Sequence, residues 1–240
     1  SLNRVLGNLT NALNYADSQN ADQIVITGDA LDYLSMGGLE LLRDRVWNRY
    51  PQGKVLISPG NHELVQKMQG TVEESLSAEK RDKVMVIQMD NGLNDRDEVA
   101  QPHSGNLFHP EQVELLKHDL EIARQNRYVV LLFFHEAIGT RNEADREVQA
   151  TYTPGENSGV SNVQNLFENV AAGTNHDSET GEAIWNLIYE NSDNIAAVFA
   201  GHVHGDFYSE IPGKTRSIPQ LLLTALAYES GHVLKITVEY

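Results

Sequence analysis

Apolar residues recur at every third or fourth position near the start of the chain, a period typical of an amphipathic helix. The positions concerned are Leu2, Val5, Leu6, Leu9, Ala12, Leu13 and Ala16. The same period predicts three more helices, over residues 38–50, 110–126 and 182–191. Pro110 fits the first turn of the third helix, where an N–H would have no helical partner in any case. The regular apolar positions of the first helix form one face, which can lie on a sheet.

Short apolar runs between and after these helices predict strands. They cover residues 23–27, 54–58, 83–89, 128–134 and 195–200. The run 128–134 is apolar almost throughout, as expected of a strand buried on both faces. Three further segments predict consecutive antiparallel strands, namely 206–211, 219–225 and 233–240. Helix–strand alternation followed by a β meander predicts an α/β fold with two mixed sheets packed face to face and helices outside.

The length and one polar segment bear on domain organisation. A chain of 240 residues, 40% of them hydrophobic, can bury one large core, so we expect a single domain over residues 1–240. Residues 136–180 are rich in Asn, Gly, Thr and Glu and show little periodicity. Segments of this length without periodicity are usually functional loops or mobile ones. We expect a cap or substrate loop here, with a short helix near residues 163–170, and a mobile loop is the alternative.

Charge and residue usage exclude several classes of function. Lys and Arg number 18 against 34 Asp and Glu, and the formal net charge of −16 argues against general nucleic-acid binding. The chain has no cysteine, which excludes disulfides, thiolate zinc sites and cysteine nucleophiles and leaves His, Asp, Asn and Glu as possible metal ligands. No apolar run approaches the roughly 20 residues that span a bilayer, so we expect no membrane span. Neither compartment nor oligomeric state follows from the composition.

Four polar motifs stand where predicted strands end. They are Gly28-Asp29, Gly60-Asn61-His62-Glu63, His135 and Gly201-His202-Val203-His204. Each alone has an ordinary explanation, since a Gly-Asp after a strand is often a turn and a His-x-His pair often lies on a strand face. Because the carboxyl ends of strands in open α/β sheets place ligands at one edge, the four motifs together predict one shared site.

In this order the motifs resemble the signature of the calcineurin-like metallophosphoesterases: Asp-x-His, Gly-Asp, Gly-Asn-His-Asp/Glu, His and Gly-His-x-His. Four of the five blocks are present, and they span residues 28–204. The first block is expected just before Ser1, which would make the chain incomplete at its N-terminus. The resemblance implies a four-layer α-β-β-α sandwich. It also implies a pair of divalent ions, Mn²⁺, Fe²⁺ or Zn²⁺, on nitrogen and oxygen ligands.

The resemblance further implies a role for each matching residue. Asp29 would bridge the two ions, and the second ion would also be bound by Asn61, His135 and His202. The first ion would be bound by Asp29, His204 and the Asp and His of the absent block. The catalytic residues would be Asp29 and His62, with His62 at the leaving-group oxygen.

Some polar residues fall outside this pattern. The purple acid phosphatase subgroup has a Tyr three residues after the bridging Asp, where this chain has Asp32, so a tyrosinate-bound ferric ion is not expected. Asp32 fits a helix N-cap better than a site residue. His118 and His232 are expected to be surface or structural residues. The best further candidates for substrate contact lie in polar loops, and they are His103, His109 and His176.

These inferences predict an enzyme, a metal-dependent hydrolase that attacks a phosphomonoester or phosphodiester with a hydroxide activated by two ions. The expected substrate is a small phosphate ester, because the acidic chain disfavours polyanions. The alternative is a degenerate metallophosphoesterase fold that serves as a binding module without catalysis. A hydrolase that uses the same pair of ions on another kind of substrate is a third reading.

Overall fold

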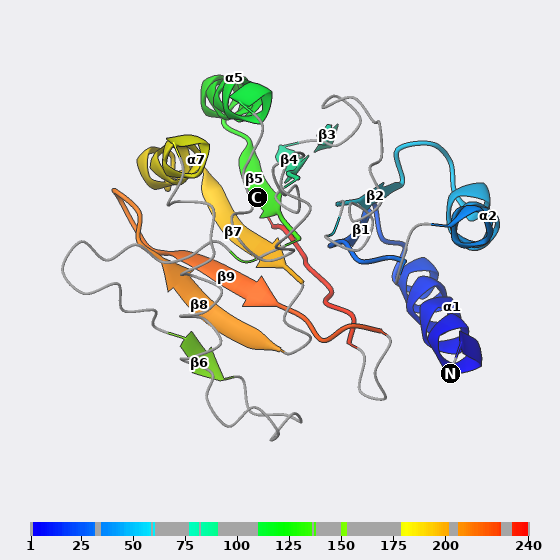
Figure 1. Cartoon of the computed structure of the whole chain (residues 1–240). Coiled ribbons are helices and arrows are strands. Elements are labelled where there is room, and N and C mark those ends of the chain that lie inside the picture. Colours follow the sequence, from blue (N-terminus) through cyan, green and yellow to red (C-terminus); the bar gives the residue numbers. More distant parts are fainter. Residues whose placement is uncertain are drawn as a thin grey trace.

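The computed structural model describes residues 2–31, 35–58, 60, 77–81, 83–90, 110–135, 137, 150–152, 179–201, 206–226 and 232–239. These residues form four α-helices, one 3-10 helix and nine strands, which pair into two sheets (Figure 1). In this part of the chain no helix is both long and apolar enough to cross a membrane.

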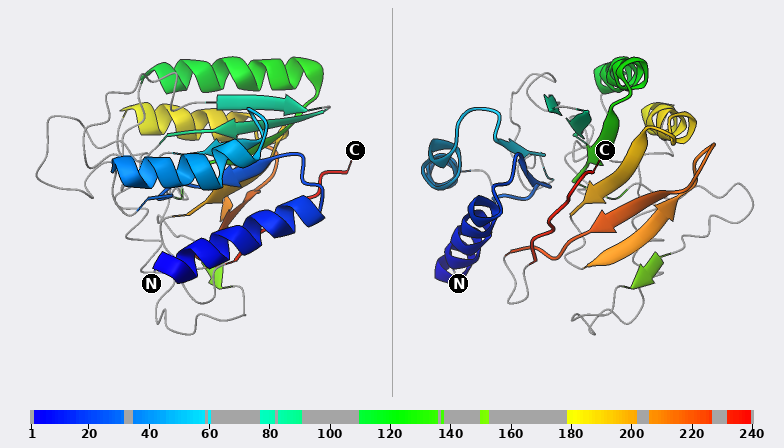
Figure 2. Two further views of the ribbon diagram at one scale, coloured as in Figure 1. Left: turned by 90° about the vertical axis from the view of Figure 1, so that its right-hand side faces the viewer. Right: turned by 180° about the vertical axis from the view of Figure 1, so that it is seen from behind.

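The small sheet consists of two parallel strands, β1 (Ile24–Ile26) and β2 (Val55–Ile57). Its outer face is covered by α1 (Leu2–Ser18) and α2 (Met36–Arg45), as Figure 2 shows. Side chains alternate along each strand, so that Ile24 and Ile26 face the helices while Val25 faces the other way. The cluster between helices and sheet is centred on Leu13, Leu31, Leu42, Val46 and Val55.

The start of α2 corrects one prediction. Ser35 is its N-cap, and the Ser35 hydroxyl accepts a hydrogen bond of 3.1 Å from the Gly38 N–H. A capping hydroxyl at this position satisfies one of the unpaired amides of the first turn. The prediction that Asp32 caps the helix is therefore wrong, and Asp32 itself lies outside the described residues.

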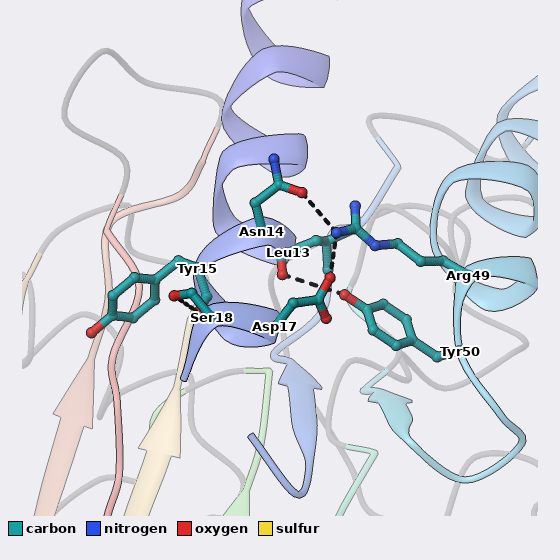
Figure 3. Close-up of polar contacts among 7 residues, drawn as sticks. All are labelled: Leu13, Asn14, Tyr15, Asp17, Ser18, Arg49 and Tyr50. Atoms are coloured by element: carbon teal, nitrogen blue, oxygen red, sulfur yellow. Dashed lines mark hydrogen bonds and ion pairs between the residues drawn. The ribbon is translucent and has the colours of Figure 1, made fainter. Parts of the chain in front are cut away.

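A group of polar contacts joins α1 to the segment between α2 and β2 (Figure 3). Arg49, in the 3-10 helix η1 (Trp47–Arg49), donates to Asn14 at 2.7 Å and to Asp17 at 2.5 Å. The next residue, Tyr50, donates from its hydroxyl to the Leu13 carbonyl at 3.4 Å. These contacts fix the C-terminal half of α1 over the small sheet.

The large sheet has seven strands in the order β3-β4-β5-β7-β9-β8-β6. Their bounds are β3 Ser77–Arg81, β4 Val84–Gln88, β5 Val129–Phe133, β6 Ala150–Tyr152, β7 Ile195–Ala200, β8 Phe207–Ile211 and β9 Ile218–Leu222. The four central strands β4, β5, β7 and β9 are parallel. Their carboxyl ends therefore lie at one edge of the sheet.

Two apolar layers cover the faces of the large sheet. On the outer face, α5 (Pro110–Asn126) and α7 (Glu179–Glu190) pack on a cluster that includes Leu116, Leu132 and Ile188. On the inner face, Phe133 and Phe199 stack with ring centroids 4.8 Å apart, and Leu56 of the small sheet joins the same cluster. The order of layers is thus helices, small sheet, large sheet and helices, which confirms the expected two-sheet α/β fold (Figures 1 and 2).

The C-terminal region departs from the prediction in part. Strands β8 and β9 form the expected antiparallel pair, with Phe207 opposite Leu222 and Ile211 opposite Ile218. The strand expected over residues 233–240 is wrong, because no strand is assigned to residues 232–239. Val238 packs against the inter-sheet cluster, whereas Val233 is 46% exposed. The helix expected near residues 163–170 and most of the segment 136–180 lie outside the described residues.

Candidate metal centre

The ends of β1, β2, β5 and β7 meet at one place. The Ser58 N–H, just after β2, donates to the Ile26 carbonyl at 2.8 Å. After β7, the Gly201 N–H donates to the carbonyl of His135, the residue that follows β5, at 2.9 Å. His135 in turn reaches β1, since its Nδ1 lies 2.7 Å from the Thr27 carbonyl oxygen. Hydrogen bonds of backbone and side-chain groups therefore connect the strand ends at which the four predicted motifs stand.

Asp29 and His135 form the described core of the site. The Nε2 atom of His135 lies 3.2 Å from Oδ2 of Asp29, and the His135 side chain is 1% exposed. A carbonyl oxygen only accepts hydrogen bonds, so the contact with Thr27 assigns the N–H to Nδ1. A neutral ring with this tautomer presents the Nε2 lone pair to the carboxylate oxygen, whereas a doubly protonated ring donates from Nε2 to it in an ion pair. In the neutral form Nε2 and Oδ2 of Asp29 are two acceptors that one cation could bind.

Two glycines make this arrangement sterically possible. Gly28 has φ +92°, and a Cβ there would lie 2.3 Å from Nδ1 of His135. A Cβ on Gly60 would lie 2.2 Å from Oδ1 of Asp29. Asp29 itself has φ 49°, in the left-handed region that residues other than glycine rarely adopt. The backbone thus closes around the Asp29 carboxylate and the His135 ring, with no room for further side chains at these two positions.

Buried polar side chains that the motifs did not reveal lie at the ends of β2 and β4 and on α5. Gln88, at the end of β4, donates a hydrogen bond to the Ile57 carbonyl and so ties the large sheet to β2 just before Gly60. The side-chain amide of Gln112 on α5 accepts a hydrogen bond from the Asp90 N–H and donates one to the Asp90 carbonyl, each of 2.8 Å. Ser58, Gln88 and Asp90 are 0%, 4% and 1% exposed.

The remaining predicted site residues lie outside the described part of the chain. These are Asn61, His62, His202 and His204. The described residues Gly60 and Gly201 immediately precede them, and both contact the Asp29–His135 pair or its backbone. Within the described ranges no three His, Asp or Glu side chains gather to hold an ion. The structure therefore brings two of the five predicted ligands together, along with the starts of the two loops that carry the other three.

Comparison with known proteins agrees with this geometry. The family model described as calcineurin-like phosphoesterase matches residues 3–206, well over half of the chain. The chain belongs to the calcineurin-like phosphoesterase family. Among solved structures, this phosphoesterase is similar to a dimetal phosphatase from Danio rerio, with a TM-score of 0.57 and 15% identity. That match covers 92% of this chain and 78% of the other, and it shows a shared fold. A comparison with curated proteins found no match.

Membership of this family implies divalent ions at a dinuclear site, and the residues described fit that requirement. A carboxylate and a neutral imidazole are an oxygen and a nitrogen ligand of the kind that Mn²⁺, Fe²⁺ and Zn²⁺ accept. The hydrogen bond between His135 and Thr27 is the outer contact that usually fixes a metal-binding histidine ring. The chain has no cysteine, so it offers no soft thiolate ligand to a metal ion.

Proposed function

We propose that this phosphoesterase hydrolyses a small phosphomonoester or phosphodiester with a hydroxide activated by two divalent ions. The observation that carries the proposal is the buried contact between His135 and Asp29, 3.2 Å apart, with the proton of His135 held on the opposite nitrogen by Thr27. When bound, a pair of ions lowers the pKa of a shared water and stabilises charge on phosphate oxygens. The family match supports the same class of reaction.

The proposed ligands follow the order of the motifs. One ion would be bound by Asp29, Asn61, His135 and His202. The other would be bound by Asp29 and His204, together with an Asp and a His of the kind that the family's first block supplies. Mn²⁺, Fe²⁺ and Zn²⁺ are the proposed ions, since all ligands are nitrogen or oxygen.

The protein side chains then have distinct tasks. Asp29 would be shared by the two ions, and the strained turn at Gly28 and Asp29 keeps its carboxylate directed at His135. Burial of His135 keeps its ring in one orientation. The proposed role of His62 is that of a general acid, which would donate a proton to the leaving-group oxygen as its bond to phosphorus breaks. No protein nucleophile is needed for this reaction.

Substrate choice is proposed to depend on the segment 136–180, which follows the ligand His135 directly and would form a cap over the site. The net charge of −16 disfavours polyanions and therefore favours a small ester over nucleic acid. Both bis-p-nitrophenyl phosphate and p-nitrophenyl phosphate are suitable probes, because they separate diesterase from monoesterase activity.

The decisive experiment uses the chain as its gene encodes it, purified and supplied with Mn²⁺. Asp29→Asn should lower kcat for either ester by about 100-fold or more, because loss of a residue that merely orients a ligand already costs 10–100-fold. Asp22→Asn is the matched control, an exposed acid close in sequence that should leave kcat unchanged. Unchanged activity in Asp29→Asn would contradict the bridging role. Binding of phosphate esters without turnover in the wild type would favour the binding-module alternative.

A further inference from the structure

The residue that follows the loop 202–205 makes two contacts with its carboxylate. Oδ1 of Asp206 accepts a hydrogen bond of 2.8 Å from the Thr224 N–H, just after β9. Oδ2 of Asp206 accepts a hydrogen bond from Nδ1 of His232. His232 also donates from its backbone N–H to the Thr224 carbonyl at 3.5 Å. One carboxylate thus joins three segments, the start of β8, the end of β9 and the C-terminal segment.

These contacts lie at the same sheet edge as the candidate metal centre. Ala200, the last residue of β7, pairs with Leu222 of β9 in parallel register, and Leu222 also pairs with Phe207 of β8. Asp206 and Thr224 therefore flank the carboxyl end of β9, one strand away from the end of β7. Thr224 is 2% exposed, while the side chains of Asp206 and His232 are 29% and 34% exposed.

The described residues on either side of residues 202–205, Gly201 and Asp206, are consequently both held by the surrounding structure. At its entry, Gly201 donates its N–H to the His135 carbonyl at 2.9 Å. At its exit, the Asp206 carboxylate binds Thr224 and His232. Only four residues separate Gly201 from Asp206, so a displacement of Asp206 would change the distance that residues 202–205 have to span. Metal ligands need to be held to within about 0.5 Å, so the exit contact bears on ion binding.

We propose that Asp206 and His232 form a positioning pair that holds His202 and His204 in place for metal binding. This inference rests on the proposed function. His232 lies outside every block of the family signature, and its role follows from the contact with Asp206. Neither residue is a ligand, and the pair acts through the loop that it fixes.

The test measures ion binding apart from turnover. Mn²⁺ affinity of the full gene product is measured by calorimetry, and the rise in Tm on adding Mn²⁺ is measured by thermal unfolding. His232→Ala should weaken the affinity for at least one ion about tenfold or more, as for other residues that orient metal ligands. The Mn²⁺-dependent rise in Tm should shrink with it, because that rise depends on affinity. A purely structural role would lower Tm without Mn²⁺ and leave the increment unchanged.

Three further variants sharpen the result. His232→Asn places an amide N–H near the position of Nδ1 and should restore most of the affinity. Asp206→Asn keeps an acceptor for Thr224 but not the carboxylate for His232, and it should weaken affinity as His232→Ala does. His118→Ala, an exposed histidine on α5, is the control and should behave as wild type. Wild-type affinity and increment in His232→Ala would overturn the role of the pair alone, whereas a wild type that binds no ion would overturn the proposed function as well.

Discussion

Asp29 and Gly28 adopt positive φ angles of 49° and 92° in succession, directly after β1. The turn that results directs the Asp29 carboxylate toward His135 instead of along the strand. Conformations of this kind cost free energy and persist where surrounding contacts enforce them. Here both Gly60 and the His135 ring lie close to the turn. The local strain is therefore part of how the ligand pair is assembled.

Replacing Gly28 by Ala tests whether the turn at Gly28 and Asp29 is needed to assemble the ligand pair. The new Cβ would lie 2.3 Å from Nδ1 of His135 at a φ that L residues avoid. We expect Gly28→Ala to lower the free energy of unfolding by about 1–3 kcal/mol and to abolish the stabilisation by Mn²⁺. Denaturant unfolding with and without Mn²⁺ measures both effects.

Gly7→Ala is the matched control for Gly28→Ala. Gly7 lies inside α1, and a Cβ added there would meet no neighbouring atom within 4 Å. Alanine there should raise stability by up to about 1 kcal/mol and leave Mn²⁺ binding as in the wild type. Equal effects of the two substitutions would show that the turn at Gly28 has no special role.

The sequence predicted site residues only where a motif marks them. Asp29 and His135 follow apolar strands and belong to blocks that resemble a family signature, so their meeting could be predicted. Gln88 and Gln112 could not be found in this way, because each contacts backbone groups of another element. Such contacts depend on the register between strands and on where a helix lies, and spacing along the chain carries neither.

At the scale of elements, α1 is held to the small sheet by apolar packing and by the contacts of Arg49. The hydrogen bond from Arg49, and after it one with Tyr50, lowers the pKa of Asp17. The same bond raises the pKa of Arg49. Both shifts have the sign of a contact that favours the charged forms, so the contact stabilises the folded state while Asp17 is ionised.

The lowered pKa of Asp17 predicts a pH dependence of stability. Because the folded-state pKa lies below the unfolded value of about 3.9, the contribution is complete above that value and is lost as pH falls through the folded pKa. Asp17→Asn should therefore lower Tm at pH 7 and pH 5, and the difference from wild type should shrink below about pH 4.

Thermal unfolding from pH 7 to pH 3 tests the role of Asp17. The effect should be small and should weaken in high salt, because Asp17 is exposed. Asp22→Asn, a nearby exposed acid, is the control and should not reproduce the pattern. A difference in Tm that stays constant across the whole pH range would contradict the assigned cause.

Elements with strong apolar periodicity could be predicted closely. The helix Pro110–Asn126 and the strand Ile195–Ala200 have the expected bounds, since each buries a regular set of apolar side chains. The edge strands β3 and β6 could not be predicted in this way. Their sequences, SAEKR and ATY, lack an apolar run, and they become strands by pairing with β4 and β8. Residues 233–239 show the reverse case, in which a sequence typical of a strand does not form one.

At the scale of the whole molecule, the net negative charge of the chain bears on how the candidate metal centre binds its cations. The formal charge of −16 is spread over a chain whose described acids are largely exposed, including Glu40, Glu111 and Asp22. Summed charge of this size produces a potential that extends from the surface and concentrates counter-ions. The negative potential that disfavours polyanionic substrates should therefore favour the binding of divalent ions. Added salt should weaken that binding, because it screens the potential.

Raising the ionic strength from 10 to 150 mM shortens the Debye length from about 30 Å to about 8 Å and screens all but the nearest charges. Mn²⁺ affinity should consequently fall several-fold over this range at constant pH, as measured by calorimetry in KCl. A triple variant, Glu40→Gln, Glu111→Gln and Asp22→Asn, removes three exposed charges that belong to none of the predicted motifs. It should bind Mn²⁺ more weakly than wild type at 10 mM and nearly as tightly at 150 mM, because screening has already removed the contribution of those charges. If affinity in the wild type does not change with salt, the ligands alone determine binding and the acidic surface serves solvation only.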